Sequence, residues 1–544
     1  MAEIHDSKSI MKFFSNKINY IAYVILAVFA FYINYFFSNI GVYPIDTFSF
    51  FDSGYLITKG YHPIKDFWVI SGVLIDYIQA LFFLIFGNNW NAYIFHSSLL
   101  NVFVSIFLFF FLNSFTKSLY SNFFLSICFA TLCYPIAGTP FPYQHSFILS
   151  LVSIMVFYMA IYKESKKYWL ILPVLMFCSF LSMQLPSGLI NLFILIFAFI
   201  YFLKINRNHF FYFLIGTAFS LLLFFIYLFY VGIDLKDFII QIILFPLSIG
   251  EGRILSDEKA YESAKLLNKL TLRGTLGHFK FIFLFILANL IYLIIYLRRN
   301  ENVAFKKTFL LNLFIILCTT SFIFHQLITA NQTFIFSLIP FLCGLFFIQL
   351  YDLQKKVYKK LNIFLLILVA LITFKYHNDY NTNRKFMDLQ NSNLNNSVDA
   401  KILNKKFNNL KWITPFHFNK DPKKEIEFLQ EAINVISKDD EKKFALITHY
   451  QFFSLLTEKK INIFNRWYFA GNNTHPINNR SKYYLYYNKR INNFVKEKGI
   501  DKIYLVKTHP KEFHYLELNN LFKDFCLSEK KYNPIFSLIS VEKC

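Results

Sequence analysis

Long apolar stretches dominate the first 376 residues of this chain and decide its class before any motif is considered. Several of them run for about 18 residues or more without a charge, the length that a helix needs to cross the ~30 Å hydrocarbon core of a bilayer. Twelve apolar runs in all are candidates for spans, near 18–38, 69–86, 91–113, 119–137, 145–162, 168–183, 187–204, 209–231, 279–297, 307–325, 331–351 and 361–376. With 56% hydrophobic residues overall, the sequence predicts a polytopic α-helical membrane protein.

Charged residues indicate how many of these runs cross the membrane. If all of them crossed from a cytoplasmic N-terminus, the basic loops 163–167, 298–307 and 355–360 would lie outside, against the preference of Lys and Arg for the cytoplasmic side. All three loops return to the cytoplasm if the 69–86 run, which contains polar residues, lies at the membrane interface. We therefore expect about eleven spans in a cell inner (plasma) membrane. The same preference explains the net charge of +22 without a nucleic-acid partner.

This topology places most polar segments on the extracytoplasmic side. The membrane domain, residues 1–376, then has a first outer loop at 39–90 with interfacial helices and a second long outer loop at 232–278. The remaining residues, 377–544, are polar and rich in Lys and Asn. We expect them to form a separate extracytoplasmic α/β domain.

Two strands and a helix end are predicted inside that domain. Residues 444–449 and 502–507 have the composition of strands, and a helical stretch before the second strand ends at Lys498-Gly499, where glycine suits a helix C-terminus. The seven cysteines are scattered and show no paired CxxC spacing. Neither a zinc site nor a disulfide framework is therefore predicted.

The first outer loop holds the main candidates for catalysis, Asp46 and Asp52. An acid just outside a membrane span can act as a general base, which takes the proton from an acceptor hydroxyl or amine. That acceptor would attack the anomeric carbon of a lipid-linked sugar. Alternatively, Asp46 caps a short helix over about 47–59, a role that is compatible with catalysis.

Several further residues on the outer side are candidates for binding. Lys65 and Arg253 are candidates for the phosphate of a donor, since Arg can bind phosphate through two parallel hydrogen bonds. Lys65 could instead be an interfacial lysine that extends toward lipid headgroups. Candidates for contact with an acceptor or for lining a cavity are Tyr55, His62, Asp66, His145 and Glu251.

Weaker candidates lie late in the chain. His325-Gln326 and Asn331-Gln332 flank the outer end of a late span, where hydrogen bonds between helices are the favoured explanation for polar residues. In the C-terminal part, 465–467 and 471–476 are candidates for acceptor contact, although turns after strands explain them equally well.

The first outer loop resembles that of the glycosyltransferase C superfamily. The shared features are the loop acid, the pattern Gly-Tyr-x-Pro-x-x-Asp-Phe at 60–67, the following apolar stretch and Phe86-Gly87. The likeness extends weakly through 183–188 and 238–253, and so covers about the first 260 residues. Within the superfamily, the chain is most similar to bacterial relatives of protein O-mannosyltransferases and to lipid A aminoarabinose or galacturonic acid transferases.

The resemblance implies a GT-C-like fold and an inverting transfer of a sugar from a polyprenyl-phosphate donor, with Asp46 as the base. Two positions depart from the family pattern. Thr47 follows Asp46 where many relatives have Glu, and Gly72-Val73 stands where many have Gly-Pro. The first departure puts a second acid or metal ligand in doubt, so the need for a divalent metal stays open and no metal ligand is assigned.

The expected function is therefore that of a cell-envelope glycosyltransferase. It would work in the lipid bilayer on a polyprenyl-phosphate-linked sugar and a glycan, lipid or protein acceptor. A transporter or flippase of lipid-linked saccharide is a competing hypothesis, but the internal repeats typical of transporters are not evident. An O-antigen-type polymerase or ligase is a third, since nothing in the sequence indicates the size of the acceptor.

Overall fold

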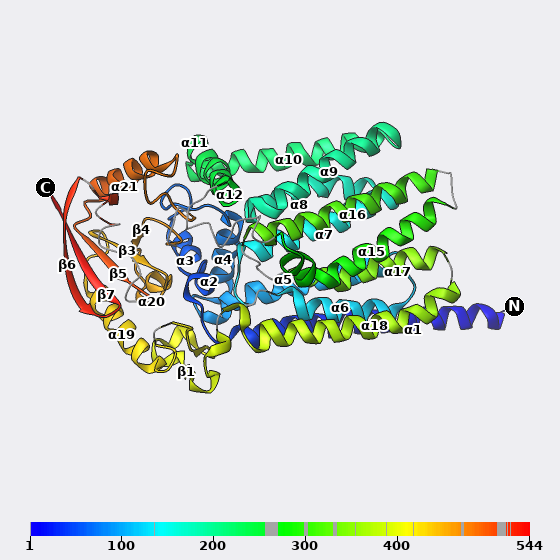
Figure 1. The fold of residues 1–544 in the computed structure, drawn as a ribbon, viewed down its shortest axis with the longest axis horizontal. Helices are drawn as coiled ribbons and strands as arrows, with labels where there is room; N and C mark the ends of the chain where they lie inside the picture. The colour runs from blue at the N-terminus through cyan, green and yellow to red at the C-terminus, as the bar shows by residue number, and fades with distance from the viewer. Residues whose placement is uncertain are drawn as a thin grey trace.

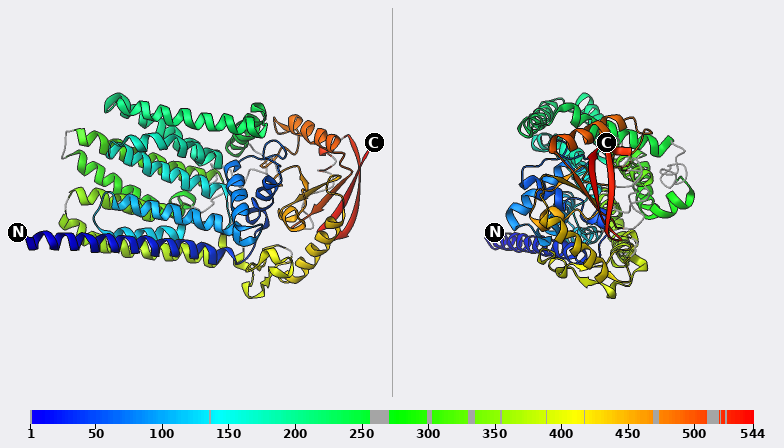
Figure 2. Two further views of the ribbon diagram at one scale, coloured as in Figure 1. Left: turned by 180° about the vertical axis from the view of Figure 1, so that it is seen from behind. Right: turned by 90° about the vertical axis from the view of Figure 1, so that its left-hand side faces the viewer.

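The fold was analysed in a computed structural model. It describes the chain except for residues 1, 135–136, 256–269, 299–302, 330–334, 354, 388, 417, 469–472, 509–517, 519 and 523. Long helices lie side by side in a bundle that forms one half of the molecule (Figure 1). The strands form the other end, and the first outer loop lies between the two (Figures 1 and 2).

The bundle confirms a helical membrane protein with several spans. Within the described residues, eight helical stretches are long and apolar enough to cross a membrane. These stretches are Ile18–Ser38 of α1 (Ala2–Ser38), α5 (Trp90–Asn113), α7 (Pro142–Tyr162), α9 (Gln184–Lys204), α10 (Asn208–Val231), Leu272–Leu297, which includes α15 (His278–Leu297), Lys307–Ile328 of α16 (Val303–Ile328), and Leu361–Thr382, which includes most of α18 (Lys355–His377). Three shorter helices pack among them, α6 (Leu119–Cys133), α8 (Lys166–Ser182) and α17 (Leu338–Leu353).

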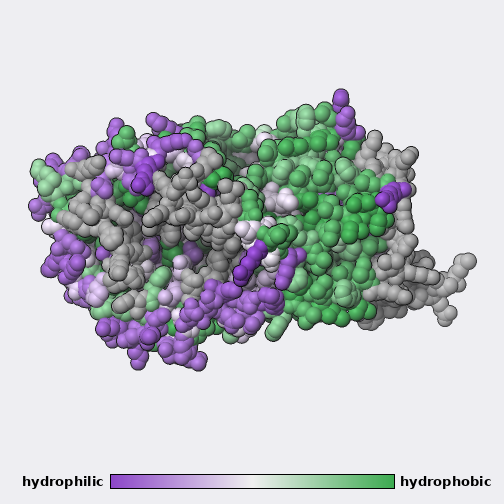
Figure 3. Space-filling view, in the orientation of Figure 1, coloured by the Kyte–Doolittle hydropathy of each residue, from purple (hydrophilic) through white to green (hydrophobic). Residues whose placement is uncertain are grey.

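Burial and surface character agree with this architecture. Helix α7 is buried along almost its whole length, so it lies in the interior of the bundle. The surface of the helical half is an apolar belt, and polar residues cover the other half (Figure 3). Phe229 and Tyr230 on α10 are 90% and 86% exposed, as expected for side chains that face lipid.

Three short helices form the first outer loop: α2 (Pro44–Thr47), α3 (Phe51–Thr58) and α4 (Val73–Phe86). The 14 residues of α4 span about 21 Å, which is too short to cross the hydrocarbon core. Its last turn exposes Leu84 and Ile85 while Asp76 and Gln79 are buried. An interfacial position agrees with this pattern. The helix predicted over about 47–59 is present as the shorter α3, but its predicted cap is wrong, because Asp46 lies inside α2 and neither helix has a side-chain cap.

The second outer loop contains α11 (Leu235–Phe238), one wide turn of π-helix at Ile239–Leu244, and α12 (Phe245–Leu255). A second wide turn at Leu272–Gly277 leads into α15. The first wide turn brings Gln241 against the first outer loop, where its side chain accepts a hydrogen bond from the Val69 amide and donates one to the Ile64 carbonyl. The two outer loops are therefore joined.

The C-terminal region, which follows α18, contains a mixed sheet. It begins with short helical turns at Asn378–Thr382, Lys385–Met387, Leu389–Asn391, Leu394–Asn396, Ala400–Ile402 and Lys405–Phe407, and with the antiparallel pair β1 (Val398–Asp399) and β2 (Lys411–Trp412). The main elements are α19 (Pro422–Lys438), β3 (Phe444–Thr448), α20 (Phe453–Thr457), β4 (Asn462–Ile463), α21 (Tyr484–Lys498), β5 (Lys502–Val506), β6 (Phe525–Asn533) and β7 (Phe536–Lys543). The sheet has the order β4-β3-β5-β7-β6, with β4, β3 and β5 parallel and the last two strands antiparallel.

Both predicted strands are confirmed as β3 and β5, each one residue shorter than expected. The predicted helix end is also confirmed, since α21 ends at Lys498 and Gly499 has a φ of 61°. The prediction that no disulfide forms is wrong for one pair. Cys526 on β6 and Cys544, which directly follows β7, are bonded with their Cα atoms 4.9 Å apart. The other five cysteines are free.

Candidate functional site

Asp46 lies in α2, a single turn that the surrounding side chains hold in place. Pro44 at its start has the φ angle of a helix and no amide hydrogen to satisfy. The Thr47 hydroxyl accepts a hydrogen bond from the Tyr43 amide at 2.9 Å. The Ser49 hydroxyl is within hydrogen-bond distance of the Ile45 and Asp46 carbonyls, at 3.0 and 2.9 Å. These few short-range hydrogen bonds define the turn, and contacts from the C-terminal region add to them.

The Asp46 carboxyl is half-buried and has an unusual acidity. Burial raises its pKa to about 7, and the nearby His449 opposes that shift. Among the described residues, no hydrogen bond to the carboxyl group is found. A carboxyl with a pKa near neutrality is suited to taking up and releasing protons at physiological pH.

His449 comes from the C-terminal region and directly follows β3. Its Nε2 atom forms a hydrogen bond with the Tyr468 carbonyl. A carbonyl only accepts, so Nε2 carries the hydrogen and the ring has a fixed tautomer when it is neutral. Nearby, burial lowers the pKa of His475 to about 3, and His449 adds to this effect. The end of β3 thus supplies a histidine within electrostatic range of Asp46.

Arg253, in α12, lies at the same site. Its Nη2 atom is 3.4 Å from Asn473 Oδ1, and its guanidinium also contacts the Tyr143 hydroxyl at the start of α7. Tyr143 in turn is within electrostatic range of Asp46 and packs against His325, with 5.0 Å between ring centroids. Within the described part of the chain, Arg253 has no carboxylate partner. The structure therefore brings Arg253 and Asp46 together around Tyr143.

Asp52, the second predicted acid, has a different use. It is completely buried on α3, and its two oxygens accept hydrogen bonds from the Ser454 and Leu455 amides, each at 2.9 Å. These amides lie in the first turn of α20, where free N–H groups need a partner. Asp52 is thus a cap for a helix of the C-terminal region, and the proposal below gives it no part in catalysis.

Lys65, His62 and Asp66 lie in one turn, and the side chain of each forms a hydrogen bond within the protein. The Lys65 ammonium donates to the Val231 carbonyl at the end of α10, at 2.8 Å. Asp66 accepts a hydrogen bond from the His62 amide at 2.7 Å, and the His62 ring contacts the Tyr77 hydroxyl. These three residues join the loop to α10 and α4, and no contact links them to Asp46.

The remaining predicted residues also lie apart from the Asp46 turn. Glu251 is exposed and forms an ion pair with Lys482 at 3.0 Å. Tyr55 is buried, and within the described part of the chain its hydroxyl has no hydrogen-bond partner. His145 is 2.9 Å from His96, between their Nε2 atoms, and thereby links α7 to α5.

Other functional candidates had weaker sequence signals. His449 ends a predicted strand, and carboxyl ends of parallel strands commonly carry sites, but nothing local indicated Asp46 as its neighbour. His325 was a candidate cavity residue, and its Nε2 atom is buried without a hydrogen-bond partner among the described residues. Asn331-Gln332 and residues 471–472 lie outside the described residues.

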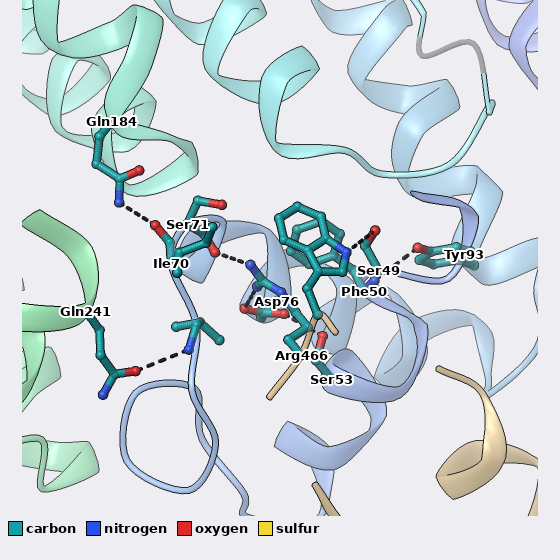
Figure 4. Close-up of polar contacts among 12 residues, drawn as sticks. Ser49, Phe50, Ser53, Ile70, Ser71, Asp76, Tyr93, Gln184, Gln241 and Arg466 are labelled. Atoms are coloured by element: carbon teal, nitrogen blue, oxygen red, sulfur yellow. Dashed lines mark hydrogen bonds and ion pairs between the residues drawn. The ribbon is translucent and has the colours of Figure 1, made fainter. Parts of the chain in front are cut away.

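Arg466 links the C-terminal region to the first outer loop. Its Nη1 atom is 2.5 Å from Asp76 Oδ2, and its Nη2 atom donates to the Ser71 carbonyl (Figure 4). The Ser53 hydroxyl donates to the other Asp76 oxygen, so both carboxylate oxygens are used. The guanidinium lies over the Phe50 ring at 4.4 Å. The loop that carries Asp46 is therefore fixed to the strand end that precedes Trp467.

Metal binding was considered for the same region. Across the described ranges, no group of three or more His, Cys, Asp or Glu side chains has an arrangement that could hold a metal ion. We therefore derive no step through a metal.

The chain was also compared with known proteins. No protein-family model matches the sequence, and no curated protein matches it significantly.

Proposed function

We propose that this protein is an integral membrane glycosyltransferase. It would transfer a sugar from a polyprenyl-phosphate donor to a glycan, lipid or protein acceptor at the outer face of the inner membrane. The observation that carries the proposal is the half-buried Asp46 carboxyl, with a pKa of about 7, in a site that also contains Arg253, which has no carboxylate partner among the described residues.

In the proposed reaction, Asp46 is the general base. The acceptor O–H or N–H proton passes to its carboxylate as the acceptor atom bonds to the anomeric carbon. The bond from that carbon to the phosphate oxygen breaks on the opposite side, and the lipid phosphate leaves with the electron pair. The configuration at the anomeric carbon is inverted, and the enzyme's contribution is to position the reactants and take up the proton.

Arg253 would bind the phosphate of the donor. A half-buried guanidinium without a carboxylate partner among the described residues is a favourable position for an anion. The His325 Nε2 atom, buried near Tyr143 and without a hydrogen-bond partner among the described residues, would donate to a phosphate oxygen. Together they would stabilise the charge that develops on the leaving group.

The proposed topology has eleven spans, obtained by adding α6, α8 and α17 to the eight long apolar stretches. The N-terminus lies at the opposite end of the bundle from the sheet (Figure 1). With the N-terminus in the cytoplasm, the basic loops at 163–167 and 355–360 would be cytoplasmic and the sheet extracytoplasmic. The Cys526–Cys544 disulfide supports this orientation, because disulfides persist in oxidising compartments.

Sugar transfer by purified protein in proteoliposomes tests the proposal, with a panel of polyprenyl-phosphate sugars as donors. Asp46→Asn should lower the rate by at least about 100-fold at wild-type abundance, because it removes the base. Asp234→Asn is the matched control. Asp234 is an exposed cap of α11 on the same outer side, and Asn caps a helix equally well. Wild-type transfer by Asp46→Asn would contradict the role of the base, and no transfer from any donor by the wild type would contradict the proposal itself.

A further inference from the structure

We infer that three consecutive residues of the C-terminal region, Arg466, Trp467 and Tyr468, are positioning residues for Asp46 and His449. The inference concerns the same site and rests on the proposed function for its consequence in catalysis. It makes the C-terminal region part of the catalytic unit rather than an appended binding module. We call these residues the 466–468 segment.

The 466–468 segment is anchored on the first outer loop by its main chain and by Arg466. The Trp68 amide donates to the Phe464 carbonyl at 2.8 Å, and the Arg466 amide donates to the Trp68 carbonyl at 3.1 Å. The buried Arg466 side chain adds the ion pair to Asp76 and the bond to Ser71 (Figure 4). These contacts leave the segment little freedom to shift relative to the loop.

Trp467 holds the turn that carries Asp46. Its Nε1 atom lies 3.0 Å from both the Ile45 carbonyl and the Ser49 hydroxyl, so one indole N–H is shared by Ile45, which precedes Asp46, and Ser49, which lies three residues after it. The rings of Phe50 and Phe141 pack against it, each with 6.4 Å between centroids. Since α2 is only one turn long, this contact from outside supplements its few internal hydrogen bonds.

Tyr468 holds His449 through two parts of the residue. Its carbonyl accepts the hydrogen of His449 Nε2. Its hydroxyl accepts from the Phe464 and Asn465 amides, at 3.0 and 3.1 Å, and donates to the Leu446 carbonyl of β3 at 3.2 Å. The segment and the strand that precedes His449 are therefore fixed to each other.

The three contacts together set the separation of Asp46 from His449. Arg466 fixes the segment to the loop, Trp467 fixes the acid to the segment, and Tyr468 fixes the histidine to the same segment. The charge of a group a few ångströms away and the degree of burial both determine a carboxyl pKa. Loss of the indole N–H should therefore change the acidity of Asp46 and with it the pH at which the base is active.

Trp467→Phe is the variant that tests the inference, because it keeps an aromatic ring and removes the N–H. Trp412→Phe is its control: this tryptophan is buried in the same region and donates its N–H to Glu425 at 3.1 Å. The pH dependence of the melting temperature is measured for the wild type, Trp467→Phe and Trp412→Phe, each with and without Asp46→Asn. The difference within each pair isolates the titration of Asp46 and needs no turnover.

In Trp467→Phe, the titration midpoint of Asp46 should fall by one pH unit or more, because a loosened α2 admits water to the carboxyl. In Trp412→Phe it should stay at the wild-type value even if the melting temperature falls. An unchanged midpoint in Trp467→Phe would overturn the inference. A shifted midpoint in a protein that transfers no sugar would uphold the positioning role while contradicting the proposed function. In an active protein, the pH profile of the rate should move with the midpoint.

Discussion

The Arg466 guanidinium and the Asp76 carboxylate form a completely buried ion pair, with 2.5 Å between Nη1 and Oδ2. The two residues are 390 positions apart in the sequence, one following β4 and the other on α4. The second oxygen of Asp76 accepts a hydrogen bond from the Ser53 hydroxyl, and Arg466 Nη2 donates one to the Ser71 carbonyl. Removal of one member of such a pair leaves the other as an uncompensated buried charge.

We predict that Arg466→Met destabilises the protein by about 3–5 kcal/mol, the range for breaking a buried ion pair. The double variant Arg466→Met with Asp76→Leu should recover part of that loss, because it removes the charge left behind. Thermal unfolding in detergent, followed by tryptophan fluorescence, measures both. A single variant as stable as the wild type would contradict the view that this pair joins the C-terminal region to the loop.

Gly72 provides a second test of the same junction. Its φ of +77° is in the left-handed region, and an added Cβ would lie 2.7 Å from the Phe50 ring and 3.2 Å from Arg466 Nη2. Gly60 has a φ of +79° but nothing within 4 Å of an added Cβ. Both Gly→Ala variants should lose about 1–2 kcal/mol from backbone strain, and Gly72→Ala about 1–3 kcal/mol more from overpacking. Equal melting temperatures for the two variants would show that the space around Gly72 is not tightly packed.

Much of the fold could be predicted from the sequence, because helices that face lipid are apolar along their own length. The same holds for β3, β5 and the end of α21 at Gly499, where the signal lies within a few residues. The start of the helix predicted over 47–59 and its cap by Asp46 were wrong, because the two short helices there are held by distant contacts. One of these is the contact between Asp52 and the first turn of α20.

The candidate site was predicted only in part for the same reason. Asp46 and Arg253 were identified from their place in outer loops, but nothing in the sequence paired them with Tyr143 or His449. Asp52 seemed equivalent to Asp46, because the hydrogen bonds that use its carboxylate come from amides about 400 residues later. Chemistry that depends on which loop meets which strand end needs the three-dimensional arrangement.

The acidity of Asp46 predicts a dependence of stability on pH. Its pKa rises from 3.8 in the unfolded chain to about 7 in the folded protein, so the folded state binds the proton more tightly. The resulting stabilisation is fully present below about pH 4 and is lost as the pH rises through about 7. Above pH 7, Asp46→Asn should therefore be more stable than the wild type, by about 1–2 kcal/mol after allowance for the partial exposure of the carboxyl.

The measurement is the difference in melting temperature between Asp46→Asn and the wild type from pH 5 to pH 9. The difference should grow through neutrality and level off above it. Asp234→Asn, at an exposed cap, should show no such rise. If the Asp46→Asn difference were independent of pH across this range, the carboxyl would have an ordinary acidity and its assignment as a base poised near neutrality would fail.

The disulfide between Cys526 and Cys544 predicts the thiol content of the protein. Alkylation after denaturation without reductant should modify the five free cysteines, and prior reduction should expose all seven. The bond closes a loop with a sequence separation of 18, for which chain entropy gives about 3 kcal/mol of stabilisation. The double variant Cys526→Ser with Cys544→Ser should lose stability of that order in the C-terminal region. Cys178→Ser, which removes a free cysteine, should keep the disulfide, so that four cysteines are alkylated without reductant and six after reduction. Seven alkylated cysteines without reductant would mean that the pair is reduced, and would remove the disulfide as support for an extracytoplasmic sheet.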